Sequence, residues 1–337
     1  MPYTDTLTLF IPIAIFYFYL KIKDNTKLQY LYVFIEAILL VGGYFLKPTC
    51  VIIGIAILLA EFLYINVKKE TIYSHLKQLG IVLVILVIGT YSVLVAYNYL
   101  KDTNISKYIS MKEFEEKSIP ATHFLMMGMK EGKISDARGK NNTMFGGYDG
   151  EDYNNTTRIK GKEEKIKYHL AIIKERLQNF GIYGYMKFVY NKVIWILSDG
   201  TFYYGAEGTF FITQPYNQSR IAKKIQGFIN ISSKKYQYIT ANIMQIVWVD
   251  LLIGIIFTYK NREKKINILK FSIIGIILFI VLFEGRARYL YNYIPMFIIV
   301  GTLGIKNIIT KIEGKLRNKK EIEHEKKESI TCNTNVL

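Results

Sequence analysis

Residues 268–305 read ILKFSIIGIILFIVLFEGRARYLYNYIPMFIIVGTLGI, two apolar runs on either side of the charged stretch EGRARY at 284–289. A helix needs roughly 17–25 apolar residues to cross the hydrocarbon core of a bilayer, and each run reaches or nearly reaches that length. The sequence therefore predicts a hairpin at a membrane surface that carries Glu284, Arg286 and Arg288. Arginine is costly close to hydrocarbon, so guanidinium groups at this depth need a partner.

Two interpretations of these arginines remain open. A planar fork of N–H donors at headgroup depth suits a phosphate that stays in the membrane. Alternatively, the arginines snorkel toward water and only fix the ends of two helices. Lys47 ends another apolar run on the same predicted membrane face. Any one of these cations alone resembles an interfacial anchor, but the set on one face favours a phosphate site formed by Lys47, Arg286 and Arg288.

Apolar runs recur along the 337-residue chain, of which 51% is hydrophobic. Such runs are typical of transmembrane helices, and a soluble fold would show a polar face on each. The sequence predicts an all-α polytopic integral membrane protein with about seven transmembrane helices. The five runs before the hairpin are 7–20, 30–45, 51–67, 79–100 and 240–259. The domains expected are 1–100 (four transmembrane helices), 101–238 (a mixed, mainly helical extracytoplasmic domain), 239–305 (three transmembrane helices) and 306–337 (a basic cytoplasmic tail).

The charge pattern predicts the orientation in a cell membrane. The net charge is +17, and the lysines cluster after the first, third and fifth runs and in the tail. By the positive-inside rule these four segments are cytoplasmic, which places the long domain, Lys47, Arg286 and Arg288 outside. No aromatic-basic pattern typical of nucleic-acid binding is present, so the basic charge points to membrane lipids and not to nucleic acid.

The long polar segment also shows local order. Residues 162–179 place Ile166, Leu170, Ile173 and Leu177 on one helical face, and Gly181 is expected to end that helix. An aromatic helix is predicted at 183–197, either at the membrane interface or packed within the domain. Residues 146–152 read as an acidic, glycine-rich loop, and 198–201 as a turn.

Several further residues are candidates for binding a sugar or an acceptor. His123 would serve as an acid, a base or a donor to phosphate, or else as a hydrogen-bonded structural residue. Asp149, Glu151 and Asp152 would bind a metal or a sugar hydroxyl, but their spacing does not match a calcium loop and favours an acidic turn in solvent. Asp5 opens the first run, either at the same outer site or as a helix N-cap. No metal or cofactor is expected.

Glu36 and Asp250 fall near the middle of two predicted spans. Acids at mid-membrane are candidates for proton relay, which leaves a transporter or flippase as an alternative function. Both acids would otherwise face the interior of the bundle and accept hydrogen bonds. A polysaccharide polymerase and a non-catalytic membrane scaffold also remain open.

Short motifs give the chain a resemblance to a known family. The membrane motifs are YTDTL at 3–7, FLKPT at 45–49, and Arg288-Tyr289 with Pro295. The external motifs are PATHFLMMG at 120–128, GGY at 146–148 with Asp152, and SDGTF at 198–202. Together they resemble the membrane glycosyltransferases of the C-type fold (GT-C), in particular glycosyltransferase family 39 with the protein mannosyltransferase-like superfamily, in a Gram-positive branch.

The resemblance implies a glycosyltransferase that uses a polyprenyl-phosphate-linked sugar on the outer membrane face, with a cell-envelope glycan or protein as acceptor. Lys47 and Arg288 match positions near the donor phosphate of that family. The catalytic acid of the family lies in the first external loop, which would precede Met1. We therefore expect the chain to lack an N-terminal part, and the catalytic residue is unknown.

Overall fold

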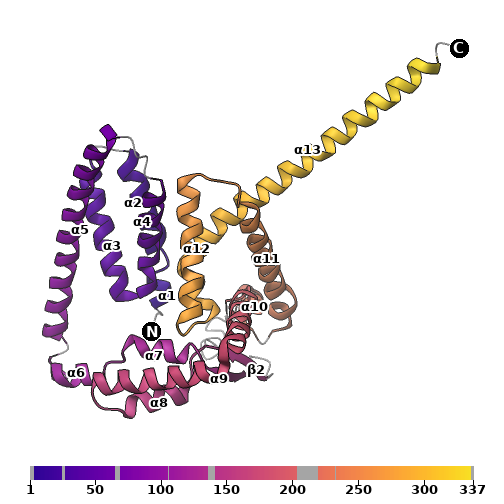
Figure 1. Cartoon of the computed structure of the whole chain (residues 1–337). Coiled ribbons are helices and arrows are strands. Elements are labelled where there is room, and N and C mark those ends of the chain that lie inside the picture. Colours follow the sequence, from indigo (N-terminus) through magenta and orange to yellow (C-terminus); the bar gives the residue numbers. More distant parts are fainter. Residues whose placement is uncertain are drawn as a thin grey trace.

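A computed structural model of the chain describes residues 4–24, 27–64, 69–104, 106–135, 141–202, 219–231 and 233–334. Helices dominate it, and they form three groups (Figure 1). Two groups of long helices stand side by side, one from the N-terminal and one from the C-terminal part of the chain. The third group lies across one end of both, so the polar middle of the sequence forms a separate layer.

The N-terminal group consists mainly of apolar helices. After α1 (Thr4–Leu7), α2 (Ile11–Asp24) packs against α3 (Gln29–Leu46), and α3 packs against the 36-residue helix α5 (Lys69–Asn104). Between α3 and α5 in the sequence, the 3-10 turn η1 (Pro48–Val51) leads directly into α4 (Ile52–Leu63). Pro48 causes the break after α3, because proline has no N–H and disfavours a helical conformation in the residue before it.

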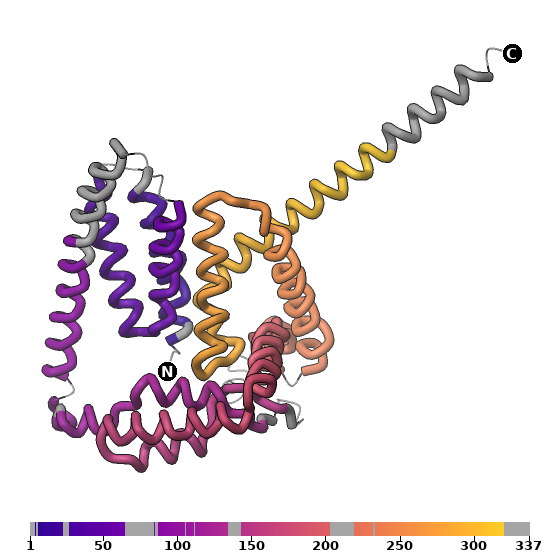
Figure 2. The backbone as a smooth tube through the Cα atoms, in the orientation of Figure 1, coloured from indigo at the N-terminus to yellow at the C-terminus, as the bar shows by residue number. Residues whose placement is uncertain are grey.

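The polar middle segment, called the external layer or external domain here because the charge pattern predicts that it lies outside, is mixed and mainly helical. It contains one hairpin, in which β1 (Glu131–Ser135) pairs antiparallel with β2 (Asn141–Phe145). The helices around the hairpin are α6 (Met111–Lys117), α7 (Ala121–Met127), α8 (Gly150–Arg158) and α9 (Lys162–Leu197). Along its length α9 changes direction (Figure 2), at Gly181, whose φ of 58° places it in the left-handed region that favours glycine. The predicted interruption at Gly181 is therefore confirmed, as a kink between two helical halves.

The C-terminal group follows. The amphipathic helix α10 (Arg220–Ile229) and the π-helical turn η3 (Tyr236–Thr240) precede α11 (Ala241–Phe257). Next, α12 (Lys264–Leu282) is joined through the 3-10 turn η4 (Ala287–Tyr293) to α13 (Ile294–Thr334). The largest contact between the two long-helix groups is the packing of α12 against α4.

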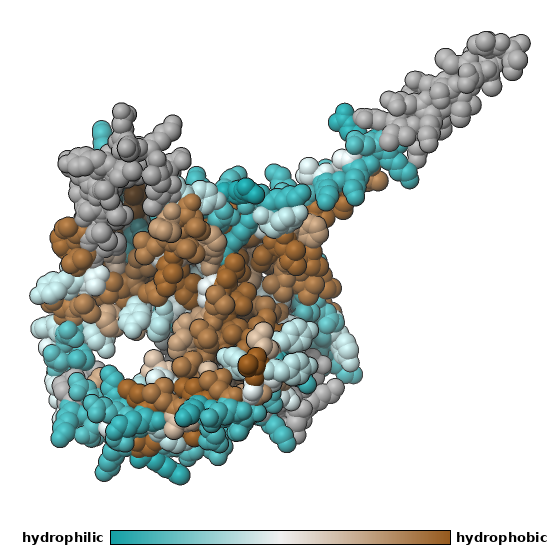
Figure 3. All heavy atoms as spheres, in the orientation of Figure 1, coloured by the Kyte–Doolittle hydropathy of each residue, from teal (hydrophilic) through white to brown (hydrophobic). Residues whose placement is uncertain are grey.

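Within the described residues, four helical stretches are long and apolar enough to cross a membrane: Gln29–Leu46, Tyr236–Phe257, Lys264–Leu282 and Ala287–Lys319. Ile11–Ile22 and Pro48–Leu63 are apolar but shorter. The run predicted at 79–100 lies within α5, whose side chains before Val84 are outside the described part. The integral membrane class is thus confirmed, and the number of seven spans stays a prediction. Figure 3 shows hydrophobic residues over the long helices and hydrophilic residues over the external layer.

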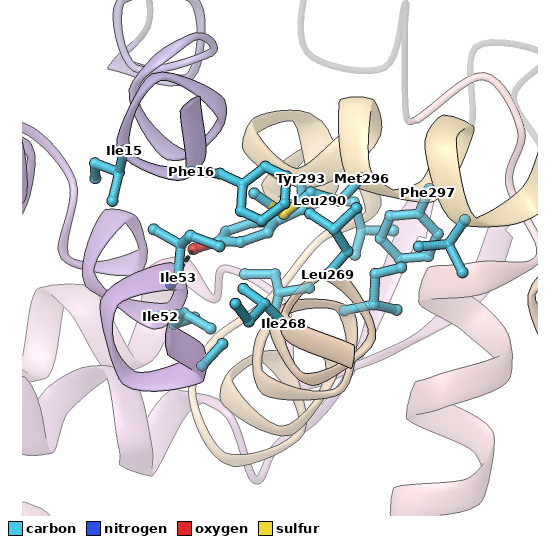
Figure 4. Close-up of a cluster of buried hydrophobic side chains, with 14 of the residues drawn as sticks. Ile15, Phe16, Ile52, Ile53, Ile268, Leu269, Leu290, Tyr293, Met296 and Phe297 are labelled. Atoms are coloured by element: carbon cyan, nitrogen blue, oxygen red, sulfur yellow. Dashed lines mark hydrogen bonds between the residues drawn. The ribbon is translucent and has the colours of Figure 1, made fainter. Parts of the chain in front are cut away.

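The main core lies where the two long-helix groups meet. Tyr293 of η4 is fully buried in it, and its hydroxyl donates to the carbonyl of Thr49 at 2.7 Å while accepting from the backbone N–H of Ile53 at 3.2 Å. These bonds satisfy a phenol that would otherwise be costly to bury. Figure 4 shows Tyr293 among apolar side chains from both groups, including Ile15, Phe16, Ile52, Ile53, Ile268, Leu269, Leu290, Met296 and Phe297.

Glycines allow α11 and α13 to approach to backbone contact. A Cβ added to Gly304 would overlap the carbonyl of Gly254, and one added to Gly254 would overlap the carbonyl of Gly301. Small residues at such crossings let membrane helices pack by van der Waals contact, because there is no hydrophobic gain from leaving lipid. The three glycines therefore set the distance between the fifth and seventh predicted spans.

We expect Gly304→Leu to destabilise the protein by about 2–4 kcal/mol, because the two helices must separate to admit the side chain. Gly314→Leu is the matched control on the same helix, since a Cβ at Gly314 meets no atom within 4 Å. Thermal unfolding in lipid nanodiscs measures the difference. Equal midpoints for the two variants would show that the crossing is not tightly packed.

The helix predicted at 162–179 is confirmed as the first half of α9, but its apolar face is only partly buried. The buried face of the first half of α9 is Lys165, His169 and Ile173, whereas Leu170 and Leu177 are exposed. The reason is that the Lys165 ammonium donates to the carbonyls of Glu116 at 2.6 Å and Ser118 at 3.0 Å, so a lysine occupies a position that periodicity reserves for apolar residues.

The acidic stretch 149–152 is the start of a helix and not the predicted loop. Asp149 is the N-cap of α8, and its carboxylate accepts from the backbone N–H of Asp152 at 2.9 Å. Glu151 and Asp152 lie in the first helical turn, where acidic side chains are stabilised by the helix dipole.

Candidate functional site

Lys47 lies at the junction of α3 and η1, in an extended conformation. Its side chain is only 8% exposed, which is unusual for a lysine. Pro48 fixes this position, because the chain leaves α3 at Lys47 and turns sharply into η1. The cation therefore points from the end of a predicted span into the protein and not into bulk water.

The charged stretch between α12 and η4 provides the other cations. Glu284 and Arg286 are both 7% exposed, and Arg288 is half-buried in the first turn of η4. The Tyr289 hydroxyl donates to the Glu284 carboxylate at 3.0 and 3.1 Å. The segment between α12 and α13 thus carries Glu284, Arg286 and Arg288 as the sequence shows, and its position at a membrane surface stays a prediction.

Lys47 and Arg288 come together at the ring of Tyr289. The Lys47 ammonium lies 4.9 Å from the ring centroid, and the Arg288 guanidinium lies 5.3 Å from it. Cations within about 6 Å of an aromatic face are attracted by its quadrupole. We call Lys47, Glu284, Arg288 and Tyr289 the cationic cluster.

The electrostatics of the cluster are dominated by burial. Burial lowers the pKa of Lys47 to about 8; Arg288 lowers this pKa and Glu284 raises it. Burial also raises the pKa of the Glu284 carboxyl, although Tyr289, Arg288, Lys192 and Lys47 all oppose that shift. Among the described residues, the buried Glu284 carboxylate therefore interacts with the three cations Arg288, Lys192 and Lys47.

Arg286 has a different neighbour. Its guanidinium lies 5.8 Å from the ring centroid of Tyr148, which belongs to the external layer. The structure thus brings Lys47 and Arg288 to one ring and places Arg286 at the contact between the hairpin and the external domain.

Lys192, in the second half of α9, ties the external domain to the hairpin. It is fully buried, and its ammonium donates to the carbonyls of Gly128, Val281 and Phe283 at 2.8, 3.0 and 2.7 Å. Three acceptors match the three N–H bonds of an ammonium group, and the carbonyls at the C-terminus of a helix favour a cation. Burial lowers the pKa of Lys192 to about 7, and Glu284 opposes this shift.

Backbone hydrogen bonds and close glycines complete the junction. The N–H groups of Glu284 and Gly285 donate to the carbonyls of Phe124 at 2.7 Å and Gly146 at 2.9 Å. A Cβ at Gly128 would lie 2.6 Å from the carbonyl carbon of Phe283. The external domain is therefore in backbone contact with the segment that carries the arginines, so its folding and the geometry of the cationic cluster depend on each other.

A layer of polar groups lies next to the cluster, within the bundle. Asn292 of η4 is fully buried, and its amide donates to the Thr8 hydroxyl at 2.8 Å. Among the residues that the structure describes, the buried Asn292 carbonyl oxygen and Thr49 hydroxyl have no hydrogen-bond partner. Asp5 lies on α1, which packs against η4, but its side chain is outside the described part of the structure.

The other acidic candidates are held in ion pairs within the external domain. Lys130 donates to Asp149 at 2.8 Å and to Glu151 at 2.9 Å. Arg176 contacts both oxygens of the buried Asp152 carboxylate, at 2.8 and 3.0 Å. Asp149 and Asp152 would have to give up these cations to bind a sugar, so the structure gives them a stabilising role. Among the described residues, no group of His, Cys, Asp and Glu is placed to hold a metal ion.

His123 also has a structural setting. It is fully buried, and its Nδ1 is 2.8 Å from the hydroxyl of Thr156, which in turn is 3.0 Å from Nε2 of His169. Burial lowers the pKa of His123, and burial together with His123 lowers that of His169 to about 4. Both rings are therefore neutral at pH 7 and join α7, α8 and α9.

Glu36 and Asp250 differ from the expectation that both face the bundle interior. Glu36 is buried on α3, whereas Asp250 is exposed on the outer face of α11. The buried residues of α11 are Trp248, Leu251 and Gly254, and the exposed Asp250 lies beside the face that they form. The two acids thus do not form an interior pair.

A family model described as "Conserved hypothetical integral membrane protein" matches residues 1–309. The chain belongs to this family. The match covers all of the long helices up to the middle of α13 together with the external domain, so the whole arrangement around the cationic cluster lies within it. Nothing matches this integral membrane protein among the curated proteins or among the solved structures.

Sequence reasoning missed Lys192, Tyr148 and the part that Tyr289 plays. For Lys192 a signal was present: it lies midway between Phe188 and Ile196, four residues from each, and all three are buried on one face of α9. A lysine in the middle of an apolar helical face indicates an ammonium that finds carbonyl partners.

Proposed function

We propose that the chain is a membrane glycosyltransferase that binds a polyprenyl-phosphate-linked sugar at the cationic cluster. The observation that carries the proposal is the meeting of Lys47 and Arg288 at the Tyr289 ring, from positions 241 residues apart in the sequence. Two cations that meet at one aromatic ring, at the end of a predicted span, suit an anionic ligand. A phosphate on a lipid reaches this depth of the membrane without leaving it.

The chemistry follows from the charge. The acceptor hydroxyl attacks the anomeric carbon of the sugar, and the bond from this carbon to the phosphate oxygen breaks. The lipid phosphate leaves with one more negative charge, which Lys47 and Arg288 stabilise from fixed positions. The proton of the acceptor passes to a base that we do not assign.

The external domain supports an acceptor site on the outer membrane face. It contacts the hairpin through Lys192 and through the backbone of Phe124 and Gly146, so an acceptor bound to it would lie beside the donor phosphate. This orientation rests on the positive-inside pattern of the lysine clusters. The transporter alternative loses support, because Asp250 is exposed and Glu36 is buried elsewhere.

Binding of a polyprenyl phosphate, measured by calorimetry in nanodiscs, tests the proposal. We expect binding of the phosphate and none of the corresponding polyprenol, because the charge provides the affinity. Equal binding of the two lipids would contradict a phosphate site. Transfer itself is tested with radiolabelled polyprenyl-phosphate sugar and cell-envelope acceptors.

Binding should weaken as the pH rises through about 8, the pKa of Lys47. The phosphate binds the ammonium form, so affinity is full below that pKa and falls above it, and binding takes up a proton near pH 8. Titrations from pH 7 to 9.5, where the phosphate stays dianionic, measure this change. Lys47→Arg is the control, because a guanidinium stays charged over this range. The same fall with pH in Lys47→Arg would assign the titration to another group.

A further inference from the structure

The helix α10 exposes an apolar face that nothing in the described structure covers. Ile221 is 73% exposed and Ile225 is 55% exposed, and Phe228 and Ile229 on the same face are exposed as well. None of the ten residues of α10 is buried. An isolated helix of ten residues is marginal in water, so a helix this apolar on one side needs a surface against which to form.

The opposite face and the residues that follow are basic. Arg220, Lys223 and Lys224 lie on the polar side of α10, and Lys234 and Lys235 come shortly after it. No acidic residue occurs between 219 and 249. On the proposed topology this segment is outside, so the positive-inside rule does not account for its charge. The charge is complementary to an anionic surface.

Contacts hold α10 at the start of a membrane span. The Thr240 hydroxyl donates to the carbonyl of Phe228 at 2.9 Å, and the Lys235 ammonium lies 5.4 Å from the centroid of the Phe228 ring. The stretch Tyr236–Phe257 is among those long enough to cross a membrane. Because α10 is bound to the first turns of this span, it lies close to the depth at which the span enters the bilayer.

We propose that α10 lies in the plane of the outer leaflet and binds anionic phospholipid. Its apolar residues would enter the boundary between headgroups and acyl chains, and its arginine and lysines would contact the headgroup phosphates. A strongly charged polar face opposite a compact apolar face is typical of helices that lie in the interface. This inference concerns bulk membrane lipid and does not depend on the proposed transferase activity.

Site-directed spin labelling of the full chain in nanodiscs tests the proposal. Labels at Ile225→Cys and at Lys223→Cys form a matched pair two residues apart and about 160° apart around the helix, in a Cys332→Ser background in which the remaining Cys50 is fully buried. Oxygen partitions into lipid and a water-soluble nickel chelate does not. We expect the ratio of oxygen to nickel accessibility to be several-fold higher at 225 than at 223.

The second measurement is how the depth of the label at 225 depends on the charge of the lipid headgroups. Replacing zwitterionic by anionic phospholipid should move the label at 225 deeper, and Lys223→Glu with Lys224→Glu should remove that shift. Equal exposure of both labels to water would overturn the proposal. So would a label at 225 that neither reagent reaches, because a protein surface would then cover the helix. An Ile225 label at the same depth in both lipids would overturn the anionic specificity.

Discussion

The Lys192→Met variant is expected to lose about 2–4 kcal/mol of stability, because three buried carbonyls lose a charged donor at once. Lys192 joins Gly128 of the external domain to Val281 and Phe283 at the end of α12. Methionine fills a similar volume but donates no hydrogen bond. Burying the ammonium costs free energy, which is why its pKa is lowered to about 7. This cost offsets part of the stability that the three hydrogen bonds contribute, so we expect a loss of no more than about 4 kcal/mol.

The Lys192→Met substitution should loosen the contact between the external domain and the segment that joins α12 to η4. Limited proteolysis in nanodiscs over a temperature series measures this, because cleavage follows the population of the open form. Lys187→Met is the matched control, since Lys187 is exposed on the same half of α9. If Lys192→Met resists protease as the control does, the backbone hydrogen bonds from Glu284 and Gly285 suffice to hold the domain.

Lys192 also illustrates which features of the structure the sequence pattern does not predict. The apolar runs at 30–45, 240–259 and 268–283 each correspond to one helix of the structure, because an unbroken apolar run has few other ways to satisfy its backbone in a membrane. Burial in the external domain follows a different rule. Lys165, Lys192 and His169 are buried because backbone carbonyls or hydroxyls of distant segments meet them, and no periodicity within α9 reveals those partners.

The candidate site could likewise be predicted only in part, because its contacts join segments that are far apart in the sequence. The positive-inside rule predicts that Lys47 and Arg288 lie on one membrane face. The structure adds that both cations lie close to the ring of Tyr289. Residue type alone could not show that Asp149 and Asp152 already pair with Lys130 and Arg176, because those partners lie 19 to 24 residues away in the sequence. In the structure these two carboxylates therefore form ion pairs with cations of the same domain.

Arg288→Ala should weaken polyprenyl phosphate binding on the order of 100-fold, about 2–3 kcal/mol, the usual cost of removing one partner of a close charge pair. The loss arises because Lys47 then faces the phosphate beside the Glu284 carboxylate, while the ammonium of Lys192 already donates to three backbone carbonyls. Arg288→Lys should recover part of the affinity, since it restores the charge without the planar fork. Lys47→Ala is expected to lower the affinity in the same direction.

The control is Arg262→Ala, which removes an exposed arginine between α11 and α12. Its affinity should equal that of the unmodified protein, and thermal unfolding of all variants separates loss of binding from loss of fold. Unchanged affinity in both Arg288→Ala and Lys47→Ala would remove the phosphate from this position. In that case the cations would serve only to anchor two helix ends at the membrane surface.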